Sequence, residues 1–366
     1  KVTILNEFCS VCGYHRKYAI RLLNQRGKPK TRRRAGRKPI YASSELMTAL
    51  KRIWFASDQM CSKKLKAAIP LWLPFYEKRY KALSQDTQDK LLSVSAATID
   101  RLLKPVRIAH GRKGLGGTRP GSLLKSQIPI RTDFWDVSQP GFMEADTVAH
   151  CGNSLAGDFV WSLTMTDILT TWTENRATWN KGAQGVVAQI QNIESSLAFD
   201  LLGFDCDNGS EFLNHHLVRY FSDHPSIQAF TRSRPYKKND NAHVEQKNWS
   251  HVRQLFGYDR LEDQTLVAMM NDLYANEWSQ YQNHFCPSMK LVSKQRINSK
   301  YYKKYDSPQT PYHRVMASDH VTDDAKAALE AVQNRLNPFI LKQAIERKLR
   351  RIFQHVKVTS NVRQRI

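Results

Sequence analysis

The feature that most constrains the fold is the order of strand and helix patterns between residues 136 and 260. Alternating apolar and polar residues favour half-buried strands, whereas apolar residues three or four positions apart favour helices. The order is strand, strand, strand, helix, strand, helix, strand, helix, at 141–150, 158–168, 170–179, 181–200, 201–207, 211–224, 227–234 and 242–258. Strands that alternate with helices favour a mixed sheet with helices packed on it.

The first helix of this region has a recognisable packing face. Its apolar residues recur at helical spacing, which places them on one side of the helix. They are Val186, Val187, Ile190, Ile193 and Leu197. We expect this side to lie against the sheet.

Net charge is distributed unevenly along the chain, and the distribution indicates a class of partner. The 366 residues carry 56 Lys and Arg against 33 Asp and Glu, a net charge of +23. Residues 136–260 hold 10 basic and 15 acidic residues, a net of −5, so the remainder carries +28. Such an excess predicts a polyanion, because Lys and Arg that neutralise phosphates release counterions. A basic surface that serves solubility is the alternative.

Residues 1–28 favour a helix-turn-helix unit that binds DNA. A short helical segment, a turn at Gly13 and a second, basic helical segment follow one another. A simple helical hairpin is the alternative interpretation. The predicted DNA contacts of this unit are Arg16, Lys17 and Arg21.

A basic linker is expected next, at residues 29–39. The run from 26 to 39 has eight Lys and Arg and no apolar periodicity, so it can follow a phosphate track. A solvated charge run without a partner is the alternative. The predicted DNA contacts in the linker are Arg32, Arg33 and Arg34.

Residues 40–108 return to helical periodicity and predict a second helix-turn-helix DNA-binding domain. The run SVSAATIDRLLKPVR is typical of a recognition helix, with Ser93 or Ser95 as its N-cap and an end near Pro105. Helices that only pack together are the alternative. The predicted DNA contacts are Arg101 and Lys104.

The remaining flanks are a linker and a basic C-terminal region. Residues 109–135 are rich in Gly and Pro and predict a linker. Residues 286–366 are basic, with a terminal helix that has Asn337 as its cap and Pro338 at its first position. The expected apolar side of that helix comprises Leu341, Ile345, Leu349 and Ile352.

Three acidic residues lie at the ends of predicted elements in the acidic middle. Asp146 is on the first strand and shares a face with Glu144, Asp207 ends the short apolar strand before Asn-Gly, and Glu245 lies near a helix start. Clustered carboxylates repel one another unless cations bind between them. Mg²⁺ prefers oxygen ligands, and two such ions promote phosphoryl transfer. The pattern therefore favours phosphodiester chemistry.

The motifs around these acids resemble a known family. E-A-D-T, D-N-G-S-E-F and R-P-Y-K-K-N-D-N-A-H-V-E-Q-K-N are similar to the catalytic core of DDE transposases and integrases, in the retroviral-integrase-like branch of bacterial insertion sequences. The resemblance covers residues 136–260, and 37 residues separate Asp207 from Glu245, slightly more than the family's usual spacing of about 35. It implies an α/β ribonuclease-H-like core with a mixed five-stranded sheet, spanning 136–285.

The resemblance also implies an activity and assigns roles to residues. It implies cleavage at transposon ends and joining of the 3′-OH to double-stranded target DNA by a homo-oligomer, with two Mg²⁺ or Mn²⁺ ions. Asp146, Asp207 and Glu245 would be both the catalytic residues and the metal ligands, with Asp205 as a rival for Asp207. The DNA contacts it suggests near the site are Lys237, Lys238, Lys247 and Asn248.

Other interpretations remain at this stage. A DNA-binding regulator could retain the fold with an inactive core, and a ribonuclease-H-type nuclease could cleave hybrids. Cys9, Cys12 and His15 could form half of a zinc site, although the six cysteines are otherwise scattered as reduced thiols. No apolar run approaches the roughly 20 residues of a membrane span, so we expect no membrane partner. The resemblance further implies a bacterial cytoplasmic protein associated with the nucleoid.

Overall fold

The computed structural model describes most of the chain in two units. The described residues are 2–24, 40–110, 137–206, 212, 215–232, 242–297 and 300–363, without the side chains of 242, 243, 245, 294, 296, 300, 301 and 357–363. The first unit extends from Lys1 to Ala42 and the second from Ser43 to Ile366.

The first unit contains two helices joined at a glycine. Helix α1 (Val2–Cys12) and helix α2 (Arg16–Asn24) are separated by Gly13, which has a φ of +65°. This left-handed conformation is easily adopted by glycine because it has no Cβ. The predicted succession of helix, turn and helix is therefore confirmed, and its role in DNA binding stays a prediction.

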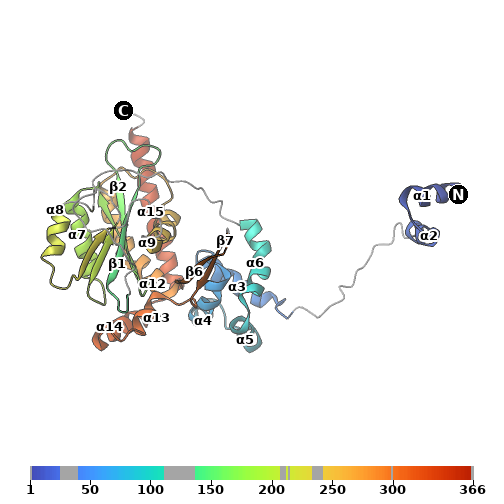
Figure 1. The fold of residues 1–366 in the computed structure, drawn as a ribbon, viewed down its shortest axis with the longest axis horizontal. Helices are drawn as coiled ribbons and strands as arrows, with labels where there is room; N and C mark the ends of the chain where they lie inside the picture. Colours follow the sequence, from blue (N-terminus) through green and yellow to red (C-terminus); the bar gives the residue numbers. More distant parts are fainter. Residues whose placement is uncertain are drawn as a thin grey trace. The chain divides into compact units, whose positions relative to one another are not determined.

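The second unit is built on a five-stranded mixed sheet (Figure 1). Its strands are β1 (Phe142–Ala149), β2 (Val160–Asp167), β3 (Thr173–Trp179), β4 (Gly203–Cys206) and β5 (Ala229–Arg232). The spatial order is β3-β2-β1-β4-β5, with β1–β2 and β2–β3 antiparallel and β1–β4 and β4–β5 parallel. This is the ribonuclease-H-like arrangement that was expected.

One hydrophobic cluster joins the sheet to helices α7 (Ala183–Glu194) and α8 (His215–Ser222). Val186, Ile190 and Ile193 of α7 are fully buried, and Val187 and Leu197 pack at the rim of the same cluster. The predicted apolar face of this helix is confirmed. The cluster also takes its sheet residues from β1, β2 and β4, so it fixes those strands relative to α7.

A continuous helical segment begins at α9 (Ala242–Lys247), which contacts β1 and β2. It continues as a π-helical turn, η1 (Asn248–Arg253), and a short helix, α10 (Gln254–Phe256). Helix α11 (Thr265–Leu273), a second π-helical turn, η2 (Tyr274–Trp278), and α12 (Ser279–Phe285) then contact β3. The sequence patterns did not predict the helices between residues 265 and 285.

Four helices precede the sheet within the second unit: α3 (Ser44–Ala56), α4 (Ser62–Arg79), α5 (Gln85–Ser93) and α6 (Ala96–His110). They are attached to the core by polar bonds. Trp72 Nε1 donates to the carbonyl of Phe285 at 3.0 Å, and the Tyr281 hydroxyl donates to the carbonyl of Ala56 at 2.6 Å. Helices α3 and α4 are therefore bonded to α12 of the core.

Helix α6 starts as expected but ends later. Ser95 Oγ accepts a hydrogen bond from the backbone N–H of Thr98 at 3.1 Å, so Ser95 is the capping residue of the two candidates. The expected end near Pro105 is wrong, because the helix continues to His110. A proline inside a helix removes one backbone hydrogen bond but does not always end it, and α4 likewise contains Pro70 and Pro74.

The C-terminal region adds a two-stranded ribbon and three helices. The ribbon consists of β6 (Leu291–Ile297) and β7 (Lys300–Tyr305), and the helices are α13 (Pro311–Met316), α14 (Asp323–Gln333) and α15 (Pro338–Arg363). Asn337 caps α15, since its Oδ1 accepts from the backbone N–H of Phe339 at 3.0 Å. Leu341, Ile345 and Ile352 are buried as expected. Across the described part of the chain, no helix has the length and apolar character needed to span a bilayer.

Candidate active site

Asp146 is the one predicted catalytic residue whose side chain the structure describes. It lies on β1 and is half-buried. Its Oδ1 accepts a hydrogen bond from the backbone N–H of Thr147 at 2.7 Å, and its Oδ2 accepts one from Asn248 Nδ2 at 2.6 Å. Both carboxylate oxygens therefore have a donor that fixes their orientation.

The parallel pairing of β1 with β4 determines which residues of the two strands lie side by side. Glu144 pairs with Asp205 and Ala145 pairs with Cys206. The next residues in the two segments are Asp146 and Asp207. Asp207 itself is outside the described residues, so its position stays a prediction. The carboxyl ends of adjacent parallel strands are where open α/β sheets commonly bind ligands.

Asp205, the rival for Asp207, is fully buried within the sheet. Its Oδ1 accepts a hydrogen bond from Thr231 Oγ1 on β5 at 2.5 Å. It also pairs with Glu144 rather than with Asp146 in the strand register. This carboxylate therefore links β4 to β5, a role that differs from the one expected of a metal ligand at the sheet edge.

Glu144 attaches the start of α9 to the sheet. Its side chain is buried, and its Oε2 accepts a hydrogen bond from the backbone N–H of Val244 at 3.2 Å. An acidic side chain is favourable near a helix N-terminus, because unpaired N–H groups point toward it. The backbone of Glu245 follows directly in α9, although its side chain is outside the described set. The helix that carries Glu245 is thus attached to the strand that carries Asp146.

Asn248 is the functional candidate that sequence reasoning did not connect to Asp146. It is three residues after Glu245, which places the two residues on the same side of a helix. It also begins the π-helical turn η1, a distortion that frequently occurs at functional sites. Its Nδ2 donates to Asp146, whereas its buried Oδ1 has no hydrogen-bond partner among the described residues. The sequence named Asn248 only as a DNA contact, and its helical spacing from Glu245 was the signal that could have placed it beside the acidic residues.

These donors suit a divalent metal such as Mg²⁺. Such ions prefer carboxylate and amide oxygens and complete their shell with water and substrate phosphate. Asp146 offers a carboxylate, and the Asn248 Oδ1 is a buried oxygen with capacity to accept. The described side chains include no group of three His, Cys, Asp or Glu that could hold a metal. Asp207 and the Glu245 side chain are outside that set.

The helix after Glu245 carries a lysine and a histidine whose environment disfavours charge. Burial lowers the pKa of Lys247 to about 7, and the positive charges of Lys64 and Arg314 add to this effect. The Lys247 Nζ donates to the carbonyl of Thr171 at 3.4 Å. Burial also lowers the pKa of His251 well below its ordinary value. Lys247 therefore contacts the protein here, and its contact with DNA stays a prediction.

His150 has the contacts of a structural histidine. It is fully buried directly after β1, and its Nε2 forms a hydrogen bond with Ser162 Oγ at 2.8 Å. Ser162 in turn is hydrogen-bonded to the Tyr274 hydroxyl at 2.9 Å. Burial lowers the pKa of His150 to about 3, helped by the nearby charge of Arg253. His243, the other histidine near the motifs, has no described side chain.

The other predicted DNA contacts fall into two groups. The side chains that the structure describes are all exposed, as contact with a large ligand requires: Arg16, Lys17, Arg21, Arg101 and Lys104. Their role in DNA binding stays a prediction. The remaining ones are outside the described residues: Arg32, Arg33, Arg34, Lys237 and Lys238.

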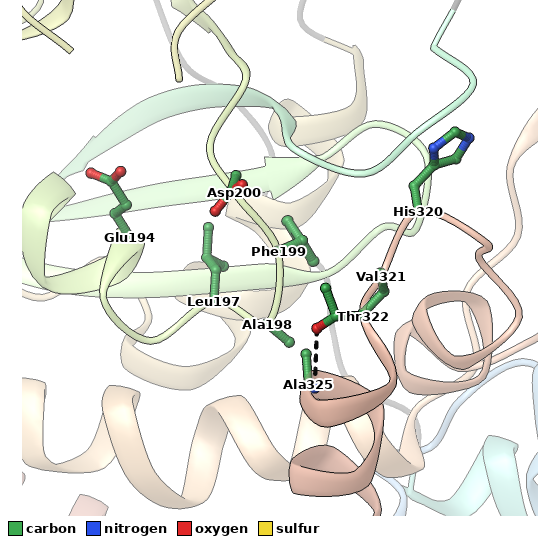
Figure 2. Close-up of a pocket in the computed structure, with 9 residues that line it drawn as sticks. All are labelled: Glu194, Leu197, Ala198, Phe199, Asp200, His320, Val321, Thr322 and Ala325. Carbon is green, nitrogen blue, oxygen red and sulfur yellow. Dashed lines mark hydrogen bonds between the residues drawn. The ribbon is translucent and has the colours of Figure 1, made fainter. Parts of the chain in front are cut away.

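A cavity of about 400 Å³ lies between the end of α7 and the start of α14 (Figure 2). Glu194, one of its carboxylates, accepts hydrogen bonds from the Tyr220 hydroxyl and from His224 Nε2, the latter at 2.6 Å. Neither Asp146 nor Asn248 lines it. The lining residues are Glu194, Leu197, Ala198, Phe199, Asp200, His320, Val321, Thr322 and Ala325.

Comparison with known proteins identifies a relative and two structures of similar fold. No family model matches the chain. The chain is 41% identical over 320 residues to the "Uncharacterized protein y4rM" of Sinorhizobium fredii (strain NBRC 101917 / NGR234), which covers 86% of this chain and 89% of that protein. The name of that relative assigns it no activity.

Two of the solved structures that resemble this chain are viral. The catalytic core domain of BIV integrase has a TM-score of 0.33 and 16% identity, covering 49% of this chain and 96% of that chain. A chain of the simian T-cell lymphotropic virus intasome in complex with PP2A regulatory subunit B56 gamma has a TM-score of 0.31 and 12% identity, covering 62% of this chain and 84% of that chain. Since these scores are low, the fold assignment rests on the strand order and register.

Proposed function

This chain belongs to the same family as the y4rM protein of Sinorhizobium fredii, and we propose that it is a DNA transposase or integrase of the DDE type. It would bind transposon ends, cleave one strand and join the resulting 3′-OH to target DNA. The carrying observation is the parallel register of β1 with β4, which brings the segments preceding Asp146 and Asp207 side by side. The attachment of α9 to Glu144 supports the same assignment, because it brings the helix that carries Glu245 to strand β1, which carries Asp146.

Asp146, Asp207 and Glu245 would hold two Mg²⁺ or Mn²⁺ ions. When bound, such ions activate the attacking oxygen and stabilise the leaving oxygen of a phosphodiester. The protein's own contribution is to orient ligands. Thr147 and Asn248 donate to separate oxygens of Asp146, so the carboxylate has a fixed direction before substrate arrives. Ligand positions held in this way reduce the reorganisation required during the reaction.

The proposed partner is double-stranded DNA, both transposon ends and target, bound by a homo-oligomer in the bacterial cytoplasm at the nucleoid. The basic flanks support this choice, since they carry a net +28 around an acidic core region. A strand-transfer assay separates this proposal from the two alternative functions. A DNA-binding regulator binds without joining, and a ribonuclease-H-type nuclease cleaves hybrids in preference to duplex DNA.

The test is a strand-transfer assay with the full chain, Mg²⁺ or Mn²⁺, a duplex copied from the DNA bordering its gene, and a supercoiled target plasmid. We expect Asp146→Asn to reduce joining by roughly 10³-fold or more, because it removes a ligand charge. Asp207→Asn and Glu245→Gln should have similar effects. DNA binding without metal should stay unchanged in all three variants.

Asp200→Asn is the matched control, since Asp200 is an exposed acid of the same unit that no motif includes. It should join DNA at the wild-type rate. Joining by Asp146→Asn at the wild-type rate would refute the assignment. Tight binding by the wild type with no joining under any metal would favour the regulator.

A further inference from the structure

The β6–β7 ribbon is a projecting element that the proposed catalytic core does not use. Within the described part of the chain its strands pair only with each other, from Leu291 opposite Tyr305 to Ile297 opposite Lys300. Every described side chain of the two strands is exposed. Val292 is 61% exposed and Tyr302 is 57% exposed, so apolar and aromatic groups face solvent as well.

The charge of the ribbon has a single sign. Residues 291–305 contain five basic residues and no acidic residue. The backbone register also sets Lys294 opposite Lys303, and like charges at directly opposed positions destabilise a hairpin. The five basic residues are Lys294, Arg296, Lys300, Lys303 and Lys304.

An isolated two-stranded hairpin is marginally stable in water, so this ribbon depends on its base. The backbone N–H of Lys290 donates to Asp306 Oδ1 at 2.6 Å, and the N–H of Asp306 donates to the carbonyl of Lys290 at 3.0 Å. Arg314 forms an ion pair with Asp306 at 2.7 Å. These bonds close the ends of the two strands against α13.

The base is also attached to the turn between β2 and β3. Lys290 Nζ donates to the carbonyl of Leu169 at 2.7 Å, and Ser288 Oγ lies 2.5 Å from Thr171 Oγ1 within hydrogen-bond distance. Thr171 has a φ of +62°, an uncommon conformation for a β-branched residue. The turn is therefore held in a defined shape by the contacts around it.

The same turn contacts the helix of the candidate active site. The carbonyl of Thr171 accepts the hydrogen bond from Lys247 of α9, while its hydroxyl bonds to Ser288 at the base of the ribbon. One residue therefore joins the element that carries Glu245 to the element that carries the basic ribbon. A ligand held on the ribbon would have a fixed relation to the candidate site.

From this geometry we propose that the β6–β7 ribbon is a DNA-binding element that contacts the phosphate backbone of the duplex. The proposal rests on the proposed function in taking DNA as the polyanion. Lys303 and Lys304 neutralise phosphates, and the exposed Tyr302 and Tyr305 hydroxyls donate to phosphate oxygens, as tyrosine does in protein–DNA complexes. Charge complementarity favours DNA over strand addition by a second protein, because a protein strand would leave five positive charges unneutralised.

The experiment measures equilibrium binding of the full chain to a fluorescently labelled 30-base-pair duplex of arbitrary sequence, without divalent metal, over a range of salt concentrations. Each neutralised phosphate contributes a slope of about −0.9 to the dependence of log K on log salt. Lys303→Ala combined with Lys304→Ala should weaken binding and make the slope shallower by about 1.8. Lys303→Arg with Lys304→Arg should retain the wild-type slope.

Lys326→Ala with Arg335→Ala is the matched control, since it removes the same charge from α14 and from the segment directly after it. Its slope should equal that of the wild type. The same slope in the ribbon alanine variant and the control would overturn the proposal. A ribbon variant that binds DNA normally but no longer self-associates in sedimentation would overturn it too, in favour of a second copy as the occupant.

The result is separable from the test of the active site. Asp146→Asn should bind the 30-base-pair duplex with the wild-type salt slope, because its substitution affects joining and not the ribbon. If Asp146→Asn joined DNA normally, the proposed function would fail while a slope change in the ribbon variant still supported DNA binding. If joining required Asp146 but the slope were unchanged in the ribbon variant, only the ribbon proposal would fail.

Discussion

The edge strand β3 and the β6–β7 ribbon differ in whether the backbone N–H and C=O groups on their outer edges are hydrogen-bonded. On β3, Asn283 pairs with both the N–H and the carbonyl of Thr173, at 2.9 and 3.0 Å, and Asn271 pairs likewise with Ala177, at 2.6 and 2.9 Å. These amides replace the strand that an edge lacks. On the ribbon, no described strand pairs with either outer edge. The β3 edge is therefore closed to a further strand, and the ribbon is open to one.

A comparison of three asparagines extends this difference to the candidate site. Asn271 and Asn283 use both amide atoms on backbone groups of β3. Asn248 uses only its Nδ2, on Asp146, and its buried Oδ1 has no partner among the described residues. Since buried polar atoms are normally paired, the oxygen of Asn248 is available for a ligand. Asparagine thus completes the hydrogen bonding of the edge strand β3, whereas beside the central strand β1 it retains an oxygen that can accept a ligand.

The largest effect on stability is expected from Asn283→Ala. The substitution leaves two buried backbone groups of Thr173 unpaired, and each such group costs about 1–3 kcal/mol. We expect the free energy of unfolding to fall by about 3 kcal/mol in chemical denaturation. Asn276→Ala is the control, because Asn276 bonds only within its own helical segment. Equal stability of the two variants would contradict the role of Asn283 at the β3 edge.

Asn248→Ala should reduce strand transfer while leaving stability nearly unchanged. The variant loses the donor that orients Asp146, and loss of such a supporting group typically costs 10–100-fold in activity or metal affinity. The rate should be measured against Mn²⁺ concentration, where a higher half-saturating concentration is expected. Wild-type activity in the variant would show that the unpaired amide oxygen has no part in ligand binding.

Acidification should destabilise the fold through His150, which is buried directly after strand β1. Its folded-state pKa of about 3 lies below the ordinary value near 6.5, so the unfolded chain takes up a proton first as pH falls. The stability conferred by neutral His150 is thus complete above pH 6.5 and decreases toward pH 3. This amounts to about 2 kcal/mol between pH 7 and pH 5.

The measurement compares the free energy of unfolding at several pH values in wild type and His150→Asn. The difference between them should shrink as pH falls, because only the wild type carries the buried imidazole. His320→Asn, which changes an exposed histidine, is the control and should follow the wild-type curve. Parallel curves for wild type and His150→Asn would rule out this contribution.

The smallest effect on stability is expected at the ribbon itself. Lys303 and Lys304 are exposed, and surface substitutions of this kind usually change stability by less than about 0.5 kcal/mol. The double alanine variant should therefore unfold at the wild-type denaturant midpoint while its DNA binding changes. A large loss of stability would mean that the ribbon is a packing element, and it would remove the contrast with β3.

Hydrophobic periodicity predicted the helices and strands that bury only one face. The three-strand meander, the apolar face of α7 and the Asn337 cap of α15 all follow from local patterns, and the structure confirms them. The helices from 265 to 285 were not predicted, although the buried residues Leu266, Met270, Tyr274, Trp278, Tyr281 and Phe285 recur at helical spacing and form an apolar stripe that the sequence contained. The end of α6 beyond Pro105 was mispredicted for a different reason, since tertiary packing can offset the cost of one lost hydrogen bond.

By itself, the sequence determined the order of strands and helices, the charge contrast between core and flanks, and the three acidic motifs, because residue chemistry and short-range spacing are local properties. Only the tertiary structure decided that Asn248 bonds to Asp146, that Asp205 is buried against Thr231, and that Thr171 joins α9 to the ribbon. Contacts between residues tens of positions apart depend on strand register and helix docking. Those are set by the packing of the whole unit and are not encoded in any single segment.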